Sequence, residues 1–420
     1  MEKKISIAVI GTGRIGLPLC LSFAEAGYKV FGVDVNTELI STLKAGKMPF
    51  VEEGTLPLLK KHHGKNFIPS STFNVVHNCQ YIILTLGTPV DENMNPSLVQ
   101  IDSALNSLKK FLRSGQTLIL RSTVSPGTTE YVKHFLNNID GIKVEKNFYL
   151  AFCPERIAEG KAIREIREIP QIVGGVDKKS TIKATELFSA FKIKCWETDS
   201  LSAELAKLFT NMYRYISFAI VNEFMVIAAS YHRDIYHIVD LVNRDYKRGG
   251  LAAPGLTAGP CLFKDGFFLI NDIPFVDLIS TSWKVNEAIP LFLVRKIRER
   301  TKLQEKKAVV LGLAFKANID DTRESLSLKV KKALEREGAE VFVHDPFVKD
   351  FDGDVYEIIK DADLIFIATN HDEYRELDLK KIMKLVKKRC IICDIWNIFK
   401  TDKIIFTFNS LLNNHKEVFD

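Results

Sequence analysis

The stretch that decides the fold lies near the start of the chain: ISIAVIGTGRIGLPLCLSFAEAGYKVFGVDV, Ile5 to Val35. An apolar run leads into a glycine loop, a helical stretch follows, and a second apolar run ends at Asp34. The pattern G-x-G-x-x-G is weak alone, and a glycine turn in another α/β unit is the alternative. Between a strand and a helix, with an acid about 20 residues downstream, it is typical of a dinucleotide-binding βαβ unit. The sequence therefore predicts a Rossmann-like domain at the N-terminus.

Each glycine of this loop has its own expected role. Gly11 permits the tight turn, Gly13 lets a pyrophosphate approach the backbone, and Gly16 lets helix and strand pack closely. The helix N-terminus supplies N–H groups and the positive end of a dipole. Asp34 is expected to hold a ribose 2′-hydroxyl and to repel a 2′-phosphate, which favours NAD over NADP. The predicted cofactor contacts of this segment are Gly11, Gly13, Arg14, Ile15, Gly16 and Asp34.

Length and composition narrow the class of protein. A chain of 420 residues with 46% apolar and 26% charged residues is expected to form two or three globular domains. The net charge of +6 comes without a basic block interleaved with aromatics, which argues against nucleic acid as a partner. No apolar run reaches about 18 residues uninterrupted, so no membrane span is predicted. The apolar N-terminus runs into the glycine loop without a cleavage pattern, and a cytoplasmic location is expected.

Cysteine usage also favours a cytoplasmic location. The seven cysteines are odd in number and scattered, which suits free thiols in a reducing compartment. Cys390 and Cys393 form a lone CxxC within the apolar run CIICDIW. A metal site would need a second ligand pair at similar spacing, so both are predicted to be buried strand residues and no metal is expected.

Three further strand-like runs end in small polar or charged residues: YIILTLGTP, TLILRSTVSPGTT and FYLAFCPER. Ligands of doubly wound sheets bind beyond the carboxyl ends of the strands, so these loops are where a site is expected. The residues in such positions are Thr85, Gly87, Thr88, Ser122, Thr123, Glu155 and Glu159.

The alternation of strand and helix stops at about residue 199. The following segment predicts one long helix or two in sequence, mostly apolar, which suggests burial between domains or subunits. Glu204, Lys207, Asn211 and Arg214 recur in it at helical spacing and form one polar stripe. A solvated face is the alternative, although such faces more often repeat Lys and Glu than Asn.

Near residue 305 the alternation resumes, and a strand, a loop, a helix and a strand ending in Asp345 repeat the N-terminal order. The glycine fingerprint is missing, and the loop offers Lys316, Asp320, Asp321 and Arg323 instead. We therefore predict an α/β fold of two Rossmann-like doubly wound domains joined by a central long-helix region. The predicted boundaries are 1–198 for the NAD-binding domain, 199–300 for the central region and 301–420 for the C-terminal domain. Two nucleotide-type folds imply two nucleotide-bearing ligands.

Cys261 lies in GPCLFKDG, Gly259 to Gly266. A helix that begins at or just after it, together with Lys264, would favour the thiolate. A thiolate beside a nicotinamide suggests covalent capture of an aldehyde, loss of hydride to NAD, and hydrolysis of the resulting thioester. That chemistry takes an alcohol to an acid in two oxidations. The alternative is a cysteine that is merely buried.

The motifs GTGRIG, STVSPGTT, CPERIAEG, AELAKLFTNMYR, GPCLFKDG and GLAFKANIDDTRES stand in this order along the chain. Together they resemble the UDP-glucose/GDP-mannose dehydrogenases, which make sugar-nucleotide uronic acids, and the resemblance covers nearly the whole chain. It implies an NAD domain, a central dimerisation region that makes a homodimer, and a C-terminal domain that binds a UDP-sugar. The product would serve as a precursor of surface polysaccharide.

The resemblance also implies roles for single residues. It makes Cys261 the nucleophile, with Asp265 and Lys207 as the pair that activates water and steadies the oxyanion. Asn211 lies beside them, Thr123 is implied to position the water, and Glu155 to do acid/base work. Further cofactor contacts are implied at Ser122, Thr123, Glu159, Lys264 and Arg323. The implied substrate contacts are Glu155, Arg156, Lys207, Asn211, Arg214, Arg248, Gly259 and Lys316.

Two departures bear on the substrate. Arg156 gives the PER found in relatives that act on N-acetylhexosamine nucleotides, where glucose-specific members have phenylalanine. Those relatives often show GGHC and VDP around the cysteine, where this chain has GPC and KDG. UDP-N-acetylmannosamine or its gluco epimer is therefore favoured over UDP-glucose. Arg244 and Arg248 both suit the arginine that relatives reach across the dimer to the substrate, and spacing to Cys261 favours Arg248.

Two other classes remain as alternatives. A two-electron β-hydroxyacid dehydrogenase shares the N-terminal domain and a helical domain, but needs neither the cysteine nor residues beyond about 300. A non-enzymatic NAD-binding protein would not require Lys207, Asn211, Cys261 and Asp265 to converge.

Overall fold

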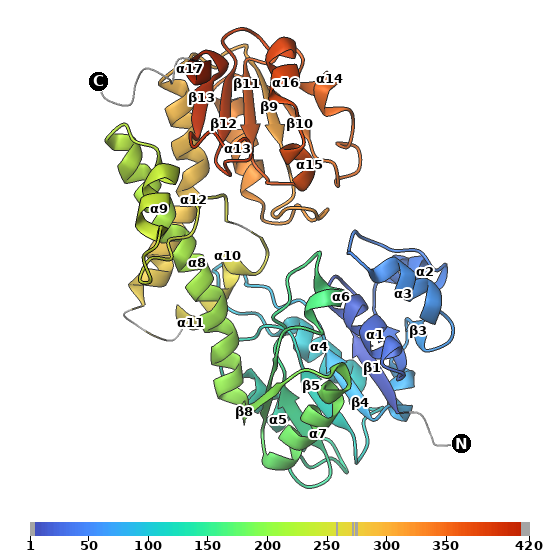
Figure 1. The fold of residues 1–420 in the computed structure, drawn as a ribbon. Helices are drawn as coiled ribbons and strands as arrows, with labels where there is room; N and C mark the ends of the chain where they lie inside the picture. Colours follow the sequence, from blue (N-terminus) through green and yellow to red (C-terminus); the bar gives the residue numbers. More distant parts are fainter. Residues whose placement is uncertain (1–4, 258, 271–272, 274–275, 413–420) are drawn as a thin grey trace. The chain divides into compact units, whose positions relative to one another are not determined.

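The computed structural model describes residues 5–257, 259–270, 273 and 276–412 (Figure 1). The chain divides into two compact units. Unit 1 comprises Met1–Thr210 with Lys264–Pro274, and unit 2 comprises Asn211–Phe263 with Phe275–Asp420. The division therefore changes from one unit to the other at three points: inside helix α8 (Ser200–Ser230), between Phe263 and Lys264, and between Pro274 and Phe275.

Unit 1 is built on an eight-stranded sheet in the order β3-β2-β1-β4-β5-β6-β7-β8. All neighbours run parallel except β6 and β7. The direction in which successive strands are added to the sheet reverses between β1 and β4. Such a switch point is where doubly wound sheets bind ligands. The strands are β1 (Ser6–Ile10), β2 (Lys29–Val33), β3 (Phe67–Ser70), β4 (Tyr81–Leu84), β5 (Thr117–Leu120), β6 (Tyr149–Phe152), β7 (Gln171–Gly175) and β8 (Cys195–Asp199).

Both faces of this sheet are covered. Side chains alternate between the faces of a strand, so Ile7 and Val9 enter one hydrophobic cluster while Ala8 and Ile10 enter another. This explains why the strands read as uninterrupted apolar runs. The helices are α1 (Gly16–Glu25), α2 (Thr37–Lys44), α3 (Thr55–His62), η1 (Phe73–Asn78), α4 (Val99–Leu108), α5 (Thr128–Asn137), α6 (Ala162–Glu165), α7 (Lys178–Phe188), η2 (Ser189–Phe191) and α11 (Phe267–Ile270).

Unit 2 contains a five-stranded sheet in the order β10-β9-β11-β12-β13, in which only β12 and β13 are antiparallel. The strands are β9 (Lys307–Leu311), β10 (Glu340–His344), β11 (Leu364–Ile367), β12 (Ile391–Asp394) and β13 (Ile405–Thr407). The helices, besides most of α8, are α9 (Ile235–Asn243), α12 (Asp277–Arg298), α13 (Leu326–Arg336), α14 (Val355–Ile359), α15 (Asp372–Arg375), α16 (Leu379–Leu385) and α17 (Phe408–Leu412), and the short α10 (Leu262–Asp265) spans the boundary between the units.

This topology confirms the predicted fold class of two Rossmann-like sheets and a central helical region. The second unit reverses direction between β9 and β11, as the first does between β1 and β4. The segment after residue 199 is predicted as one long helix or two in sequence, and the structure has two, α8 and α9. The exact domain boundaries at residues 198 and 300 stay a prediction.

Helix α8 is long and apolar enough to cross a membrane by length and composition, and 39% of its most apolar window is buried. One such helix is weak evidence, because core helices pass the same test. The Asn222 side chain that interrupts its apolar run donates to Gly255 O (3.0 Å) and to Asn286 Oδ1 on α12 (2.9 Å). Asn222 is fully buried and thus ties α8 into the core of unit 2.

Cys390 and Cys393 are free and buried, which confirms the predicted burial of both, whereas the predicted place in a strand holds for Cys393 alone. Cys393 lies in β12 and Cys390 just before it. Burial raises the pKa of the Cys390 thiol to about 12, and it raises that of Cys393 as well, so neither is a ready thiolate. The described residues hold no group of three or more His, Cys, Asp or Glu that could bind a metal ion.

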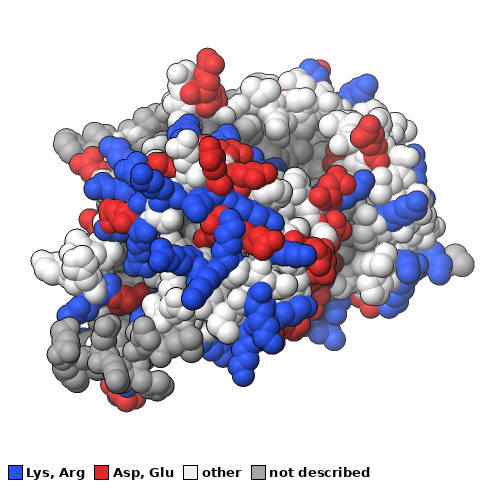
Figure 2. Space-filling view, turned by 90° about the horizontal axis from the view of Figure 1, so that it is seen from above, with Lys and Arg blue, Asp and Glu red and all other residues white. Residues whose placement is uncertain are grey.

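Surface charge is mixed. Figure 2 shows Lys and Arg side chains interspersed with Asp and Glu on the face in view. Interspersed signs leave little of the single-sign field that draws nucleic acid to a protein. The expected lack of a nucleic-acid partner stays a prediction.

Candidate active site

Packing within unit 1 requires two of the three loop glycines. Gly11 has a φ of +95°, and a Cβ there would lie 2.5 Å from Thr85 O. A Cβ on Gly16 would lie 1.8 Å from Gly11 O. Gly13 differs, because a Cβ there would meet nothing within 4 Å. The protein itself does not need a glycine at 13, so the open space above it fits a ligand that closes on the backbone.

Asp34 follows β2 and lies against the same loop. Its Oδ2 accepts a hydrogen bond from Thr12 N (2.7 Å), and its Oδ1 accepts one from Asn36 N (2.9 Å). The carboxylate is only partly buried. The open backbone at Gly13 and a fixed, accessible acid next to it fit the pyrophosphate and ribose of NAD, which would supply a hydride acceptor.

Arg14 and Glu159 connect this loop to the CPERIAEG segment. They form an ion pair of 2.8 Å, and the Arg14 guanidinium lies 5.0 Å from the centre of the Phe50 ring. The resemblance implies that Glu159 contacts the cofactor. The structure gives it Arg14 as a partner, so Glu159 also holds a loop residue in place.

Glu155 lies in an internal network. Its carboxylate pairs with Arg121 and accepts hydrogen bonds from Arg156 N (2.7 Å) and Ile157 N (2.9 Å). Arg121 also donates to Gln171 Oε1 (2.9 Å), and the side chains of the ion pair are 3% and 10% exposed. This geometry supports a role in fixing the turn after β6, whereas the acid/base role stays a prediction. Sequence reasoning missed Arg121, although a charge inside the apolar run TLILRST was a signal.

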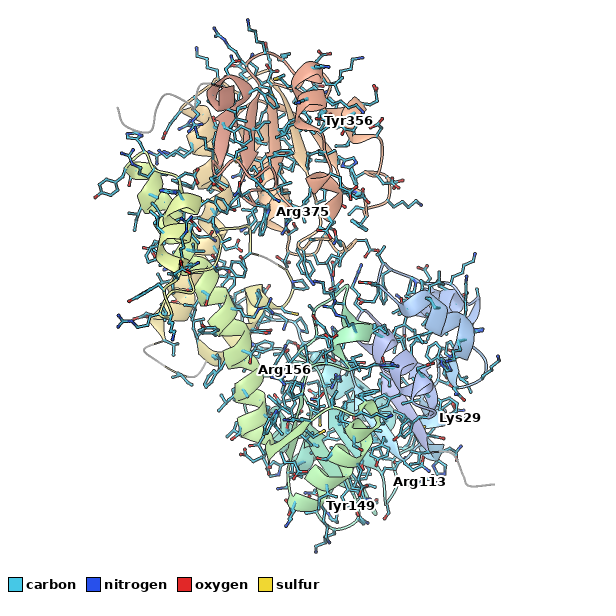
Figure 3. The ribbon with its side chains drawn as sticks, in the orientation of Figure 1. Lys29, Arg113, Tyr149, Arg156, Tyr356 and Arg375 are labelled. Carbon is cyan, nitrogen blue, oxygen red and sulfur yellow. The ribbon has the colours of Figure 1, made fainter. Side chains whose placement is uncertain are left out.

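Arg156, labelled in Figure 3, is expected to contact substrate. In unit 1 its guanidinium donates to Pro170 O and is partly buried. Burial lowers the pKa of Arg156, while Glu155 opposes that effect. The structure therefore gives Arg156 a bond to the main chain of unit 1, and its substrate contact stays a prediction.

A second cluster joins residues far apart in sequence. Lys264 Nζ lies 2.9 Å from Asp265 Oδ1 and 3.4 Å from Thr88 Oγ1, and it packs over the Phe268 ring at 4.3 Å. Thr88 in turn donates to Thr123 O (2.6 Å). Asp265 is fully buried, so it needs a cation beside it. The structure brings Thr88, Thr123, Lys264 and Asp265 together, and Lys264 forms an ion pair with Asp265.

The polar stripe on α8 divides into different roles. Glu204 is buried, and its carboxylate accepts hydrogen bonds from Gly127 N (2.7 Å), Thr129 N (2.8 Å) and the Thr129 hydroxyl. These groups form the N-terminus of α5, so Glu204 caps that helix. Burial raises the pKa of Glu204 against the effect of these bonds. The alternative of a solvated face is therefore wrong for Glu204, which is buried and holds the N-terminus of α5.

The rest of the stripe differs in exposure. Lys207 is partly buried, Asn211 is buried and Arg214 is exposed. Lys207 belongs to unit 1 and Asn211 to unit 2.

The cysteine loop in unit 2 rests on the GLAFKANIDDTRES segment. Gly259 has a φ of +104°, a Cβ there would lie 2.6 Å from the Phe315 ring, and its N–H donates to Glu324 O (3.2 Å). Gly259 is therefore required by packing. Cys261 is exposed and directly precedes α10, so a helix does begin just after it.

The loop after β9 is fixed by a buried acid. Asp345 follows β10, and its Oδ2 accepts hydrogen bonds from Leu313 N (2.7 Å) and Ala314 N (2.9 Å). His371 Nε2 lies 3.1 Å from the same oxygen, while His371 Nδ1 accepts from Asn318 N (3.0 Å). Because Nδ1 accepts, the proton of a neutral ring sits on Nε2 and is donated to Asp345.

Asp345 and His371 are both fully buried. Burial alone would raise the pKa of Asp345, but the bonds from His371 and the loop outweigh it, and the pKa is lowered. This pair holds both ends of the segment that carries Lys316. Sequence reasoning did not find the pairing of Asp345 with His371.

Three predicted arginines remain in unit 2. Arg323 is exposed and pairs with Asp321. Arg244 pairs with Asp240 on α9, and Arg248 lies over the Tyr246 ring at 5.3 Å. Both Arg244 and Arg248 are exposed, so the choice between them stays open.

The fold and the sites define the class. A Rossmann-like sheet with a dinucleotide loop and a second sheet with a different loop are what an NAD-dependent dehydrogenase of nucleotide-linked substrates requires. The chain belongs to the UDP-glucose/GDP-mannose dehydrogenase family: the NAD binding domain matches residues 5–192, the central domain 201–288 and the UDP binding domain 309–401. The resemblance and the prediction of NAD as cofactor are thus confirmed.

Relatives match along nearly the full length. The chain is 33% identical to the UDP-N-acetyl-D-mannosamine dehydrogenase of Methanocaldococcus jannaschii over 410 residues, 94% of this chain and 93% of that protein. A solved structure of UDP-D-ManNAc dehydrogenase from Pyrococcus horikoshii matches with a TM-score of 0.86 and 31% identity, covering 91% and 93% of the two chains. A UDP-glucose dehydrogenase from Pyrobaculum islandicum matches with a TM-score of 0.82 and 25% identity, covering 92% and 98%.

Proposed function

We propose that this protein oxidises the C6 hydroxymethyl group of UDP-N-acetylmannosamine to the uronate, in two steps that each reduce one NAD. The observation that carries the proposal is the match along the whole chain to dehydrogenases of that sugar nucleotide. Arg156 in CPER supports an N-acetylhexosamine, and UDP-N-acetylglucosamine and UDP-glucose are the alternatives. The product would be a precursor of surface polysaccharide.

The proposed chemistry uses the exposed thiol of Cys261. Alcohol, two NAD⁺ and one water give carboxylate, two NADH and three protons. After the first oxidation, Cys261 Sγ adds to the aldehyde carbon and forms a thiohemiacetal, which the second oxidation turns into a thioester. Water then cleaves the thioester and returns the thiol. Lys207 and Asn211 are proposed to stabilise the oxyanion, and Asp265 and Thr123 to direct the water.

The experiment that tests the proposal is an NADH assay across UDP-N-acetylmannosamine, UDP-N-acetylglucosamine, UDP-glucose and GDP-mannose. We expect UDP-N-acetylmannosamine to give the highest kcat/KM and two NADH per uronate formed. One NADH per substrate with an aldehyde product would point to two-electron chemistry. No turnover of any sugar nucleotide, with NAD still bound, would favour a non-enzymatic NAD-binding protein.

Cofactor choice is expected to depend on Asp34. NAD should support turnover and NADP barely, because the carboxylate binds a ribose hydroxyl and repels a 2′-phosphate. Asp34→Ser should raise KM for NAD about 10- to 100-fold, which corresponds to the loss of one charged hydrogen bond. It should also reduce the preference for NAD over NADP. Glu38→Ser, at an exposed acid on α2, is the matched control. Equal wild-type rates with both cofactors would remove the assignment.

His371→Ala should weaken sugar-nucleotide binding, given the proposed role of Lys316. The change removes the bond from His371 to Asp345 and leaves Asn318 N without its acceptor, so the segment that carries Lys316 loosens. We expect KM for the UDP-sugar to rise about tenfold and KM for NAD to stay unchanged, since the NAD loop belongs to unit 1. Both constants can be measured by steady-state kinetics, with exposed His134→Ala as control. A lower melting temperature with an unchanged KM would make the pair purely structural.

A homodimer through the central helix is part of the proposal. Tyr213, Ile220, Phe224 and Ile227 on α8 and Tyr231 directly after it recur at heptad-like spacing, and each is at least 41% exposed. Such an exposed stripe is typical of an interface. Light scattering should give twice the chain mass of 47.6 kDa. Phe224→Glu should shift this toward the monomer, and Ile182→Glu on α7 should not; a wild-type monomer at micromolar concentration would count against the interface.

A further inference from the structure

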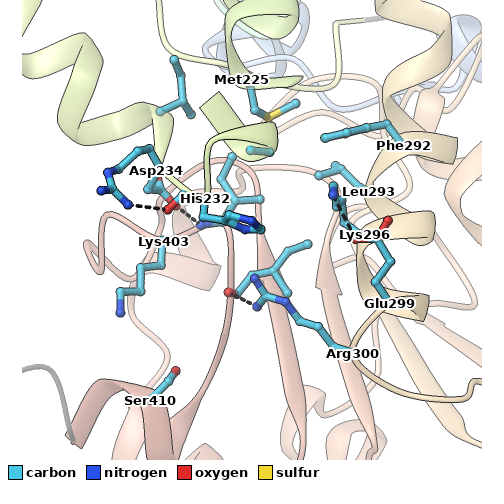
Figure 4. Close-up of a pocket in the computed structure, with 15 residues that line it drawn as sticks. Met225, His232, Asp234, Phe292, Leu293, Lys296, Glu299, Arg300, Lys403 and Ser410 are labelled. Carbon is cyan, nitrogen blue, oxygen red and sulfur yellow. Dashed lines mark hydrogen bonds and ion pairs between the residues drawn. The ribbon is translucent and has the colours of Figure 1, made fainter. Parts of the chain in front are cut away.

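Unit 2 contains a cavity of about 460 Å³ that the proposed chemistry does not use (Figure 4). It lies between the turn that joins α8 to α9, the C-terminal turns of α12, and the segment around β13. None of its lining residues belongs to the Cys261 loop or to the segment that carries Lys316. They are Met225, Ala229, His232, Arg233, Asp234, Ile235, Phe292, Leu293, Lys296, Glu299, Arg300, Lys403, Ile404, Ile405 and Ser410.

The wall of the cavity has two characters. Figure 4 shows Met225 and Phe292 at one end and Arg300, Lys403 and Ser410 at the other. The first end offers a thioether and an aromatic ring, which suit an apolar or planar group. The second offers a guanidinium and an ammonium, which are donors that bind phosphate oxygens, while the Ser410 hydroxyl already donates to Thr407 O (2.7 Å).

The charges do not cancel within the cavity. Four cationic side chains line it against two carboxylates. Asp234 is already used, because its Oδ1 accepts from Tyr236 N (3.1 Å) at the start of α9 and its Oδ2 from Ile404 N (2.8 Å). Burial raises the pKa of Asp234, which further limits its negative charge. Glu299 pairs with Lys296 at 2.9 Å.

The other three cations are available to a ligand. Arg300 donates to Ile405 O and Arg233 to His232 O, and both are contacts to neutral main-chain oxygens. Among the residues that the structure describes, neither arginine nor Lys403 forms an ion pair. Three such cations around one cavity make a local positive potential, which is strengthened by the low-dielectric wall.

We propose that this cavity binds a small phosphorylated ligand of about nucleoside-diphosphate size. Its phosphates lie between Arg300, Lys403 and Arg233, and its base or other apolar part lies against Met225 and Phe292. The volume falls within the range of small-molecule sites, about 300–1,000 Å³. Because the ligand bridges α9, α12 and the β13 segment, its binding stabilises unit 2.

The test uses site-resolved amine labelling of the full chain, with inorganic pyrophosphate and UDP as probes. Both probes should lower the labelling of Lys296 and Lys403 at least threefold, and that of the exposed Lys349 and Lys384 not at all. Lys316→Ala should leave this protection unchanged, which separates the cavity from the proposed sugar-nucleotide site. Protection confined to Lys316 in the wild-type chain would overturn the proposal.

Two variants test the chemistry of the cavity. The double change Arg233→Gln and Lys403→Gln removes two charges without touching the contact from Arg300. It should raise about tenfold the concentration of each probe that half-protects Lys296. Phe292→Ala should lower the affinity of the cavity for UDP but leave its affinity for pyrophosphate unchanged. Unchanged affinity in the double variant, with the fold confirmed by circular dichroism, would show that these cations do not form a phosphate site.

Discussion

Cys261→Ala should abolish uronate formation while leaving NAD binding intact. Without the thiol the aldehyde has no covalent anchor, so the second oxidation loses its thiohemiacetal. NAD binding should survive because Gly11, Gly13, Gly16 and Asp34 lie elsewhere in the chain. Uronate can be measured by mass spectrometry, and NAD affinity by calorimetry.

Cys261→Ser refines this result. A neutral hydroxyl is a weak nucleophile, and an oxygen ester leaves far less readily than a thioester, so the reaction should stop before hydrolysis. Cys195→Ala, at a free and partly buried cysteine of unit 1, is the matched control and should keep normal turnover. An alanine variant at position 261 that makes uronate at near wild-type rate would end the covalent mechanism.

Lys207→Ala is expected to slow turnover by about 10²–10³-fold, the usual effect of removing one oxyanion donor. The loss should appear in kcat, with KM for NAD little changed, because the ammonium acts on charge that develops during reaction. Lys207→Arg should recover only part of the rate, since a guanidinium places its donors differently. Exposed Lys178→Ala serves as control. A kcat within threefold of wild type would remove Lys207 from the proposed machinery.

The fold could be predicted because its signals are local. The glycine loop, the apolar strands and Asp34 each depend on a few neighbouring residues, and the periodicity of α8 is a property of one segment. Contacts between residues that lie far apart in the sequence could not be predicted from such local signals. Glu204 is assigned to a polar stripe on one helix, but it caps a second helix whose first residues lie 75 and more positions earlier.

The same limit applies to the candidate site. The ion pair of Arg121 and Glu155 forms because β5 and β6 are neighbours in the sheet. Neither residue's own segment of sequence indicates that the other residue is its partner. The pairing of Asp345 with His371 likewise needs β10 and β11 on either side of β9, so that the segments after both strands meet. Single residues such as Cys261 could be selected from their motif, but what each one touches is set by tertiary structure.

The two acids that end the second strand of each sheet have a consequence for how nucleotides are held. Asp34 occupies one amide of its loop, at Thr12, and leaves the backbone at Gly13 open, whereas Asp345 takes the amides of both Leu313 and Ala314. Phosphates in unit 2 must therefore depend more on side-chain cations than on main-chain dipoles. Dissolved salt weakens the attraction between exposed charges much more than it weakens short contacts to buried amides. The sugar nucleotide should accordingly be released by rising ionic strength at concentrations where the dinucleotide is still held.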